Sequence, residues 1–157
     1  MAHVKIYTDG AASGNPGPGG YGVVLESSSG HFKELSGGFR RTTNNRMELL
    51  AVIEGLRALK SVQWEVEIVS DSKYVVDAIN KGWLYNWQRK GFKDKKNPDL
   101  WKALLPLLAK YKPRFTWVKG HNNHPQNERC DALAVAQSKR PNLPADHGYE
   151  RAERGLF

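Results

Sequence analysis

Two short apolar segments of this chain each end in an aspartate. Residues 4–8 run into Asp9 and residues 66–70 run into Asp71, and both segments have the composition of buried or half-buried strands. An aspartate before Gly or Ser often opens a turn, so either residue alone has a purely local explanation. A buried carboxylate, however, is unfavourable unless it is paired or binds a cation. Two carboxylates at strand ends therefore favour a divalent-metal site.

The chain has the size and composition of one globular domain. Its 157 residues are 39% hydrophobic and 25% charged, which is typical of neither a disordered chain nor a membrane protein. No apolar run approaches the ~20 residues that cross a bilayer, and the first residues lack the apolar stretch of a signal peptide. Cys130 is the only cysteine, so an intrachain disulfide is excluded. We expect a cytoplasmic protein with no membrane association.

A basic segment between residues 81 and 102 carries much of the positive charge. The chain has 24 Lys and Arg against 16 Asp and Glu, a net charge of +8 that favours a polyanionic partner. Seven of the basic residues and two of the acidic ones lie in this segment, interleaved with aromatic residues. Such a surface suits nucleic acid, and we expect Trp83, Trp87 and Lys90 to contact it. The alternative is a solvated helix and loop whose aromatic side chains face the core, as we expect for Trp101.

Hydrophobic periodicity predicts a mixed α/β chain. The density of Gly and Pro in residues 11–20 predicts an irregular loop, and residues 28–30 predict a hairpin turn. The expected strands are residues 3–10, 20–28, 31–42, 65–70 and 114–119. The expected helices are one that begins at Thr43 or Asn44, followed by residues 72–81, 99–111 and 127–138, with a kink at Pro106.

This order of elements predicts a five-stranded mixed sheet with helices on both faces. Three strands form an antiparallel meander, and right-handed crossovers add two parallel strands. Residues 1–138 are expected to form a single domain. Residues 139–157, which contain Pro141, Pro144 and Gly148, are expected to be a poorly ordered tail.

The predicted sheet brings acidic residues from four elements to one place. If the first and fourth strands pair in parallel, Asp9 and Asp71 become neighbours at their carboxyl ends. Glu48 then arrives from the first helix and Asp131 from the last. Four carboxylates form a hard-oxygen site suited to Mg²⁺ or Mn²⁺. The histidines and the single cysteine lack the spacing of a zinc site.

Six short motifs together resemble the bacterial type 1 ribonuclease H family. They are residues 7–10 (YTDG), 14–22 (GNPGPGGYG), 43–49 (TNNRMEL), 70–72 (SDS), 117–121 (WVKGH) and 127–131 (NERCD). The resemblance covers about residues 3–138 and implies a ribonuclease H-like fold. It also implies that Asp9, Glu48, Asp71 and Asp131 bind metal and that His121 is a loop histidine active in catalysis. A surface histidine with a purely local role is the alternative for His121.

The resemblance further implies an activity and its requirements. Members of this family hydrolyse the RNA strand of an RNA–DNA hybrid endonucleolytically, leaving a 5′-phosphate and a 3′-hydroxyl. The implied cofactors are two Mg²⁺ ions, with Mn²⁺ as a substitute, and two such ions can activate a water and stabilise the leaving oxygen. The implied partner is the hybrid, with no obligate protein partner, so a monomer is expected.

Substrate contacts also follow from the resemblance. Arg41, Thr43 and Asn97 would form a pocket for a phosphate of the DNA strand. Asn15, Asn44 and Asn45 would reach the minor groove, because amides both donate to and accept from base edges and 2′-hydroxyls. Residues 81–102 resemble the basic handle of the family, with Trp83, Trp87 and Lys90 facing the DNA strand. The chain departs from the common pattern at Lys73, at Phe92 and in a shorter loop at residues 92–98.

Two other functions are consistent with parts of the pattern. Another nuclease of the same fold, such as a junction resolvase or an integrase core, would share the carboxylates but lack the Asn44–Asn45 pair and the basic handle. A non-catalytic hybrid-binding module would need only the basic surface. The presence of all four acidic residues argues against that module.

Overall fold

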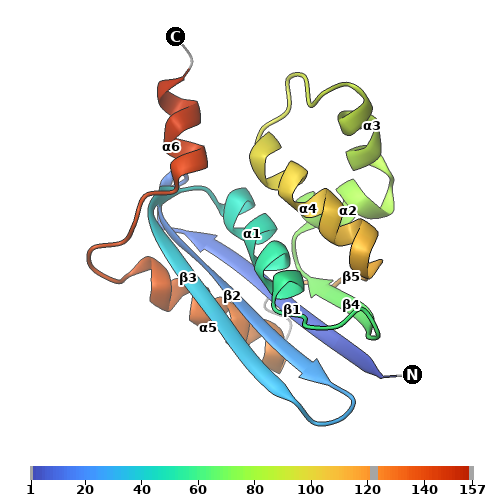
Figure 1. Cartoon of the computed structure of the whole chain (residues 1–157). Helices are drawn as coiled ribbons and strands as arrows, with labels where there is room; N and C mark the ends of the chain where they lie inside the picture. Colours follow the sequence, from blue (N-terminus) through green and yellow to red (C-terminus); the bar gives the residue numbers. More distant parts are fainter. Residues whose placement is uncertain (1, 121–123, 156–157) are drawn as a thin grey trace.

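The computed structural model describes residues 2–120 and 124–155. Figure 1 shows a sheet between helices, with a last helix standing beyond one end of the sheet. The elements are β1 (His3–Ala12), β2 (Gly17–Ser27), β3 (Phe32–Thr42), α1 (Asn44–Arg57), β4 (Glu65–Ser70), α2 (Lys73–Asn80), α3 (Trp83–Arg89), α4 (Pro98–Tyr111), β5 (Arg114–Trp117), α5 (Pro125–Ser138) and α6 (His147–Arg154).

The sheet has the predicted composition of three antiparallel and two parallel strands. Its order is β3-β2-β1-β4-β5, with β1 in the centre. Strands β1, β2 and β3 are antiparallel neighbours, whereas β4 is parallel to both β1 and β5. The expected mixed sheet and the parallel pairing of the first and fourth strands are therefore confirmed.

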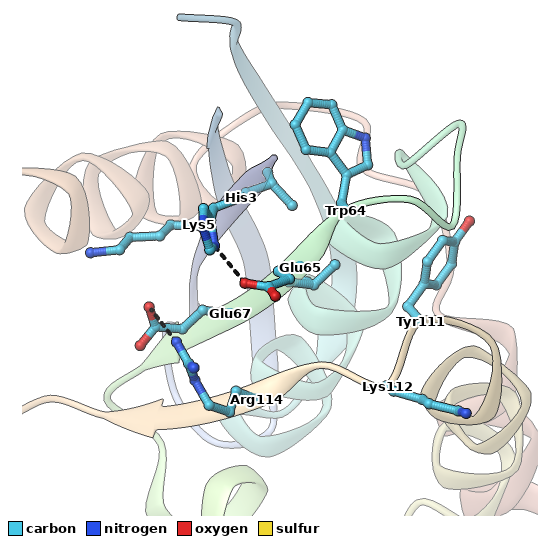
Figure 2. Close-up of a pocket in the computed structure, with 10 residues that line it drawn as sticks. His3, Lys5, Trp64, Glu65, Glu67, Tyr111, Lys112 and Arg114 are labelled. Carbon is cyan, nitrogen blue, oxygen red and sulfur yellow. Dashed lines mark ion pairs between the residues drawn. The ribbon is translucent and has the colours of Figure 1, made fainter. Parts of the chain in front are cut away.

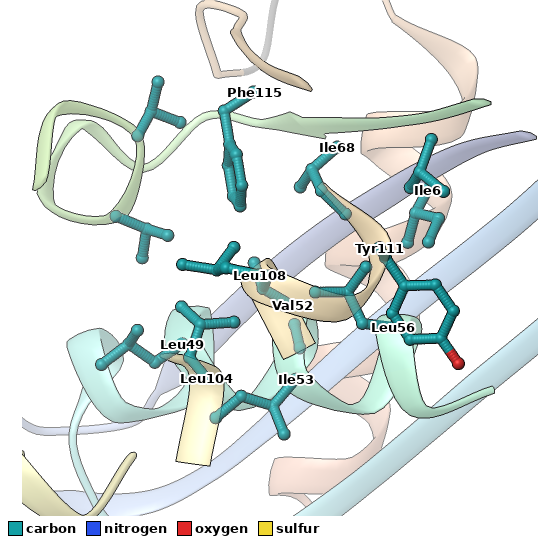
Figure 3. Packing of buried hydrophobic residues seen from close by; sticks show 14 of the residues in the cluster. Ile6, Leu49, Val52, Ile53, Leu56, Ile68, Leu104, Leu108, Tyr111 and Phe115 are labelled. Atoms are coloured by element: carbon teal, nitrogen blue, oxygen red, sulfur yellow. The ribbon is translucent and has the colours of Figure 1, made fainter. Parts of the chain in front are cut away.

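The alternation of side chains along β1 separates two apolar layers. Ile6 faces α1, where it packs with Leu49, Val52 and other fully buried residues (Figure 3). Helix α4 closes this layer with Leu104 and Leu108, and Trp101 is fully buried as expected. On the opposite face, Tyr7, Val24, Val69 and Cys130 form a smaller cluster beneath α5. Helices therefore cover both faces of the sheet. Among the described residues, no helix combines the length and apolar character needed to span a membrane.

Strand β2 begins earlier than predicted. Residues 11–20 were expected to be irregular, yet β1 extends to Ala12 and β2 begins at Gly17. Two glycines of β2 are needed for helix packing, because a Cβ at Gly20 or Gly22 would lie 2.3 or 2.2 Å from a backbone carbonyl oxygen of α5. The expectation of an irregular loop through residue 20 is wrong, since these glycines lie in a strand and let α5 approach it.

The C-terminal segment differs from the expected poorly ordered tail. Residues 147–154 form α6, and Asp146 caps the helix by accepting a hydrogen bond from the Tyr149 amide (3.2 Å). Asp146 is buried and also accepts hydrogen bonds from the Thr42 hydroxyl (2.7 Å) and the Arg46 guanidinium (2.8 Å). These contacts span about a hundred residues of sequence, so local composition did not reveal them.

Candidate active site

Asp9 and Asp71 follow the last paired residues of two parallel strands. The ladder between β1 and β4 ends at Thr8 and Ser70, so the two aspartates come next on adjacent strands. Beyond this point β1 continues to Ala12 paired with β2, while β4 stops. Asp9 is only 5% exposed, whereas Asp71 is half-buried. The sheet therefore positions both carboxylates as the sequence predicted.

Glu48 reaches the same place from the beginning of α1. Thr43 is the N-cap of this helix and accepts a hydrogen bond from the Arg46 amide (3.2 Å), which places Glu48 in the second turn. Helix α1 lies close against β1 here, because a Cβ at Gly10 would be 2.4 Å from the backbone nitrogen of Glu48. The glycine after Asp9 thus brings the two acidic residues together.

The three carboxylates form a compact cluster of oxygen atoms. Asp9, Glu48 and Asp71 each offer one oxygen, and these atoms all lie within 4.8 Å of one another. Glu48 Oε1 is buried and has no hydrogen-bond partner among the described residues. Such an orphaned, buried oxygen in an all-carboxylate cluster fits a hard divalent cation.

The pKa values in the cluster show the cost of gathering these charges. Burial, followed by the charge of Asp71, raises the pKa of Asp9 to about 8. Burial and the charges of Asp9 and Asp71 raise the pKa of Glu48 well above its ordinary value. Ionisation of Asp9 and Glu48 is therefore unfavourable in the metal-free chain, and a bound cation would reverse this.

Asp131 lies near this cluster but outside it. It is half-buried on α5, and its negative charge contributes to the raised pKa of Asp9. The structure therefore brings together three of the four predicted metal ligands and leaves the fourth beside them. His121 lies outside the described residues. His124 accepts a hydrogen bond from the Asn127 amide as the N-cap of α5, which is a local structural role.

The predicted minor-groove asparagines lie together near Glu48. The Asn15 side chain accepts a hydrogen bond from the Asn44 amide (3.0 Å), and the Asn44 side chain accepts one from the Ala12 amide. Asn45 is exposed next to them. This arrangement ties the loop after β1 to the beginning of α1 and presents amide groups at the surface.

The predicted phosphate pocket is organised around Arg46, a residue that sequence reasoning did not assign to the site. Thr43 accepts from the Arg46 amide, and the Asn97 side chain accepts from the Arg46 guanidinium (3.3 Å). Asn97 also donates to the Tyr74 hydroxyl (3.1 Å). Arg41, the third predicted member, pairs with Glu153 of α6 (2.8 Å).

Arg46 is buried between two aspartates. Its guanidinium donates to Asp99 at 2.7 and 2.8 Å and to Asp146 at 2.8 and 3.0 Å. Burial opposes ionisation of Asp99, but the hydrogen bonds and charge of Arg46 outweigh it and lower the pKa of this carboxyl. The sequence offered one signal for this role, namely that a charged residue directly precedes Met47 and the apolar residues of α1.

The two predicted tryptophans of the basic handle have different surroundings. Trp83 is 42% exposed, with the Lys81 ammonium 5.2 Å from its ring centroid. Trp87 is half-buried and packs edge-on against Trp101 at a centroid distance of 5.5 Å. Lys90 is exposed just after α3. The structure therefore leaves Trp83 and Lys90 free to contact a ligand, while Trp87 also supports the core.

Trp117 lies beside Asp71. The Trp117 indole donates to the backbone carbonyl of Asp71 (3.0 Å), and the Lys73 ammonium lies 4.7 Å from the Trp117 ring centroid. Trp117 is 41% exposed. Lys73, noted as a departure from the family pattern, thus lies at the edge of the carboxylate cluster.

A pocket of about 440 Å³ lies at the opposite end of the sheet (Figure 2). It is lined by the first residues of β1, β4 and β5, and both of its carboxylates are paired, Glu65 with His3 (2.8 Å) and Glu67 with Arg114 (3.7 Å). Because these carboxylates already have partners, the pocket is a weaker candidate for a metal or catalytic site than the cluster around Asp9.

Comparisons with known proteins agree on one family. The family model described as RNase H matches residues 1–139. The chain is 58% identical to a ribonuclease H of Desulforamulus reducens, covering 93% of this chain and 94% of the relative, and 55% identical to one of Rippkaea orientalis, covering 94% and 92%.

Solved structures show the same similarity. The structure of LC9-RNase H1, described as a type 1 RNase H with the type 2 active-site motif, is 30% identical with a TM-score of 0.80, covering 97% of this chain and 82% of that one. LC11-RNase H1, solved in complex with an RNA/DNA hybrid, is 29% identical with a TM-score of 0.62, covering 85% and 94%.

Proposed function

The chain belongs to the RNase H family and is therefore a ribonuclease that cleaves the RNA strand of RNA–DNA hybrids, and we propose which of its residues carry out the reaction. The observation that carries the assignment is the convergence of Asp9, Glu48 and Asp71, with a buried Glu48 oxygen that lacks a partner among the described residues. We assign these three residues and Asp131 as metal ligands.

The ligand set favours Mg²⁺, with Mn²⁺ as a substitute, because all four groups are hard carboxylates. Divalent cations held here would lower the pKa of an attacking water and stabilise the leaving 3′-oxygen, which produces 5′-phosphate and 3′-hydroxyl ends. Asp9, on the central strand of the sheet, would hold the cations together with Glu48 and Asp71.

The remaining assignments concern proton transfer and substrate. His121 is proposed to assist proton transfer or product departure. Asn15, Asn44 and Asn45 are proposed to read the minor groove, where the 2′-hydroxyl distinguishes RNA from DNA. Arg41, Thr43 and Asn97 are proposed to hold a phosphate of the DNA strand, and Trp83, Trp87 and Lys90 to contact that strand farther along. All these residues come from one chain, so we propose that a monomer is active.

A single cleavage assay tests this proposal. Labelled RNA–DNA hybrid, double-stranded RNA and double-stranded DNA are incubated with the protein in Mg²⁺, and the products are separated on a gel. We expect cleavage of the RNA strand of the hybrid alone, and none with Asp9→Asn or Asp71→Asn. Asp94→Asn removes the same charge from the exposed basic segment and serves as the active control. Substantial hydrolysis by Asp9→Asn would refute the site assignment.

A further inference from the structure

Helix α6 is held to the domain by polar contacts. None of its eight residues is buried, and its base is anchored by the buried cap residue Asp146. Farther along, Glu150 pairs with Arg40 (2.9 Å) and Glu153 pairs with Arg41 (2.8 Å). Figure 1 shows the helix rising from the end of the sheet where β3 leads into α1.

The Glu153 carboxylate occupies the donors of Arg41 in a forked arrangement. Arg41 Nε and Nη2 donate to Glu153 at 2.9 and 2.8 Å. A guanidinium presents the same fork to the oxygens of a phosphodiester. Arg41 therefore cannot keep this geometry with Glu153 and hold a phosphate with the same two donors.

We propose that Glu153 competes with a DNA-strand phosphate for Arg41, so that α6 restrains hybrid binding until its outer turn is displaced. The inference rests on the proposed function, which places Arg41 in the phosphate pocket. The other two members of that pocket, Thr43 and Asn97, are both bonded to Arg46. Arg46 is in turn bonded to Asp146, the residue that begins α6.

The two ends of α6 differ in how readily they can move. The Arg41–Glu153 pair is exposed, with side-chain exposures of 47% and 33%, and exposed ion pairs contribute little to stability. The Arg46–Asp146 pair is buried, with exposures of 4% and 10%. Arg41 can therefore exchange the Glu153 carboxylate for a phosphate as the outer turn moves away, while the base of the helix stays in place.

Binding measurements with matched variants test the competition. A short RNA–DNA hybrid is titrated in EDTA at low salt, so that no cleavage occurs, with the wild-type chain and with Glu153→Gln. Glu65→Gln is the control, because it removes the same charge from the exposed pair with His3, at the end of β4 away from Asp71. We expect Glu153→Gln to bind about two- to five-fold more tightly, the range of an exposed ion pair, and Glu65→Gln to match the wild type.

Two further measurements make the result decisive. In an Arg41→Gln background, Glu153→Gln should bring no gain in affinity, because the contested guanidinium is gone. Amide exchange in residues 150–154 should become faster when hybrid binds, while that of residues 49–56 in α1 should not.

The inference is overturned if Glu153→Gln binds no tighter than Glu65→Gln, if the gain persists without Arg41, or if hybrid protects α6. Cleavage by the wild-type chain in Mg²⁺ is assayed in parallel. A chain that does not cleave the hybrid refutes the proposed function, whereas a chain that cleaves it but fails the binding comparison refutes only the competition.

Discussion

Gly10 lies against the first turns of α1 so closely that a Cβ atom there would be 2.4 Å from the backbone nitrogen of Glu48 and 2.7 Å from the Cβ of Met47. The contact sets how near the helix comes to β1. It therefore sets the distance between the carboxylates of Asp9 and Glu48, which offer oxygens less than 4.8 Å apart.

Gly10→Ala is expected to separate these two carboxylates. The added methyl group must push α1 outward, which should lower the free energy of unfolding by about 1–3 kcal/mol and cleavage by about 100-fold. Gly30→Ala is the control, because Gly30 has φ +90° in the β2–β3 turn and no described atom within 4 Å of an added Cβ. It should lose stability through backbone strain and keep its activity. Normal cleavage by Gly10→Ala would show that the contact does not position Glu48.

Asp9 should make the stability of the metal-free chain depend on pH. Its pKa is about 8 in the folded chain, against 3.8 for an ordinary aspartate. Between these values the folded state retains a proton that the unfolded state releases, so the free energy of unfolding should decrease as pH rises from about 4 to about 8. Mg²⁺ should restore stability near pH 8, because it binds the folded state.

Urea unfolding in EDTA at about pH 5 and about pH 8 measures this dependence. Asp9→Asn should flatten it and should be no less stable than the wild type near pH 8, since the substitution removes one of the crowded charges. A wild-type chain more stable near pH 8 than near pH 5 without metal, with Asp9→Asn showing the same trend, would contradict the prediction.

The sequence predicted the strands of the sheet and the meeting of Asp9 and Asp71 from its apolar pattern. Alternating apolar residues determined the strands, and two strands with acidic ends predicted where Asp9 and Asp71 would meet. The glycines at residues 17–20 were misleading, because their place in β2 depends on close packing against the preceding loop, the neighbouring strands and α5, and not on their own propensity. Tertiary packing outweighed local composition there.

Helix α6 was missed for a different reason. It has no apolar face, so periodicity gave no signal, and its position depends on Asp146 contacts with Thr42 and Arg46. Long-range polar contacts of this kind leave no pattern in the surrounding residues. The same limit applies to Trp87, whose packing against Trp101 depends on how α3 meets α4.

Arg46 should be the largest single electrostatic contributor to stability outside the carboxylate cluster. Arg46→Met leaves the buried Asp146 carboxylate without its cationic partner and should lower the free energy of unfolding by about 3–5 kcal/mol. Arg57→Met, which breaks only the exposed pair with Glu54, should cost about 0–1 kcal/mol.

The pH dependence provides a second test of the Arg46 network. The pKa of Asp99 is lower in the folded chain than in the unfolded chain. The contribution of Asp99 to the free energy of unfolding is therefore fully present above its unfolded-state pKa, and it is lost as pH falls through its folded-state pKa. The wild type should therefore lose more stability on acidification than Arg46→Met. Chemical unfolding of the three chains over a range of pH measures both effects, and equal losses for Arg46→Met and Arg57→Met would contradict the assignment.

Trp83 and Trp87 lie one turn apart on α3 and should respond differently to truncation. Trp83→Ala removes an exposed ring and should weaken hybrid binding by about 1–3 kcal/mol with an unchanged melting temperature. Trp87→Ala also removes a half-buried ring that packs against Trp101, so it should lower the free energy of unfolding by about 2 kcal/mol. Thermal unfolding and hybrid titration of both variants separate the two roles.

The dependence of affinity on salt distinguishes these rings from the charges around them. Replacing Lys93 and Lys96 by Ala should flatten the slope of log affinity against log salt by up to ~2, because each phosphate contact contributes about one unit. Both lysines are exposed, so the melting temperature should not change. The tryptophan variants should keep the wild-type slope, since stacking releases no counterions. An unchanged slope in the lysine variant, together with normal affinity for Trp83→Ala, would show that the basic segment is structural and that the hybrid is bound elsewhere.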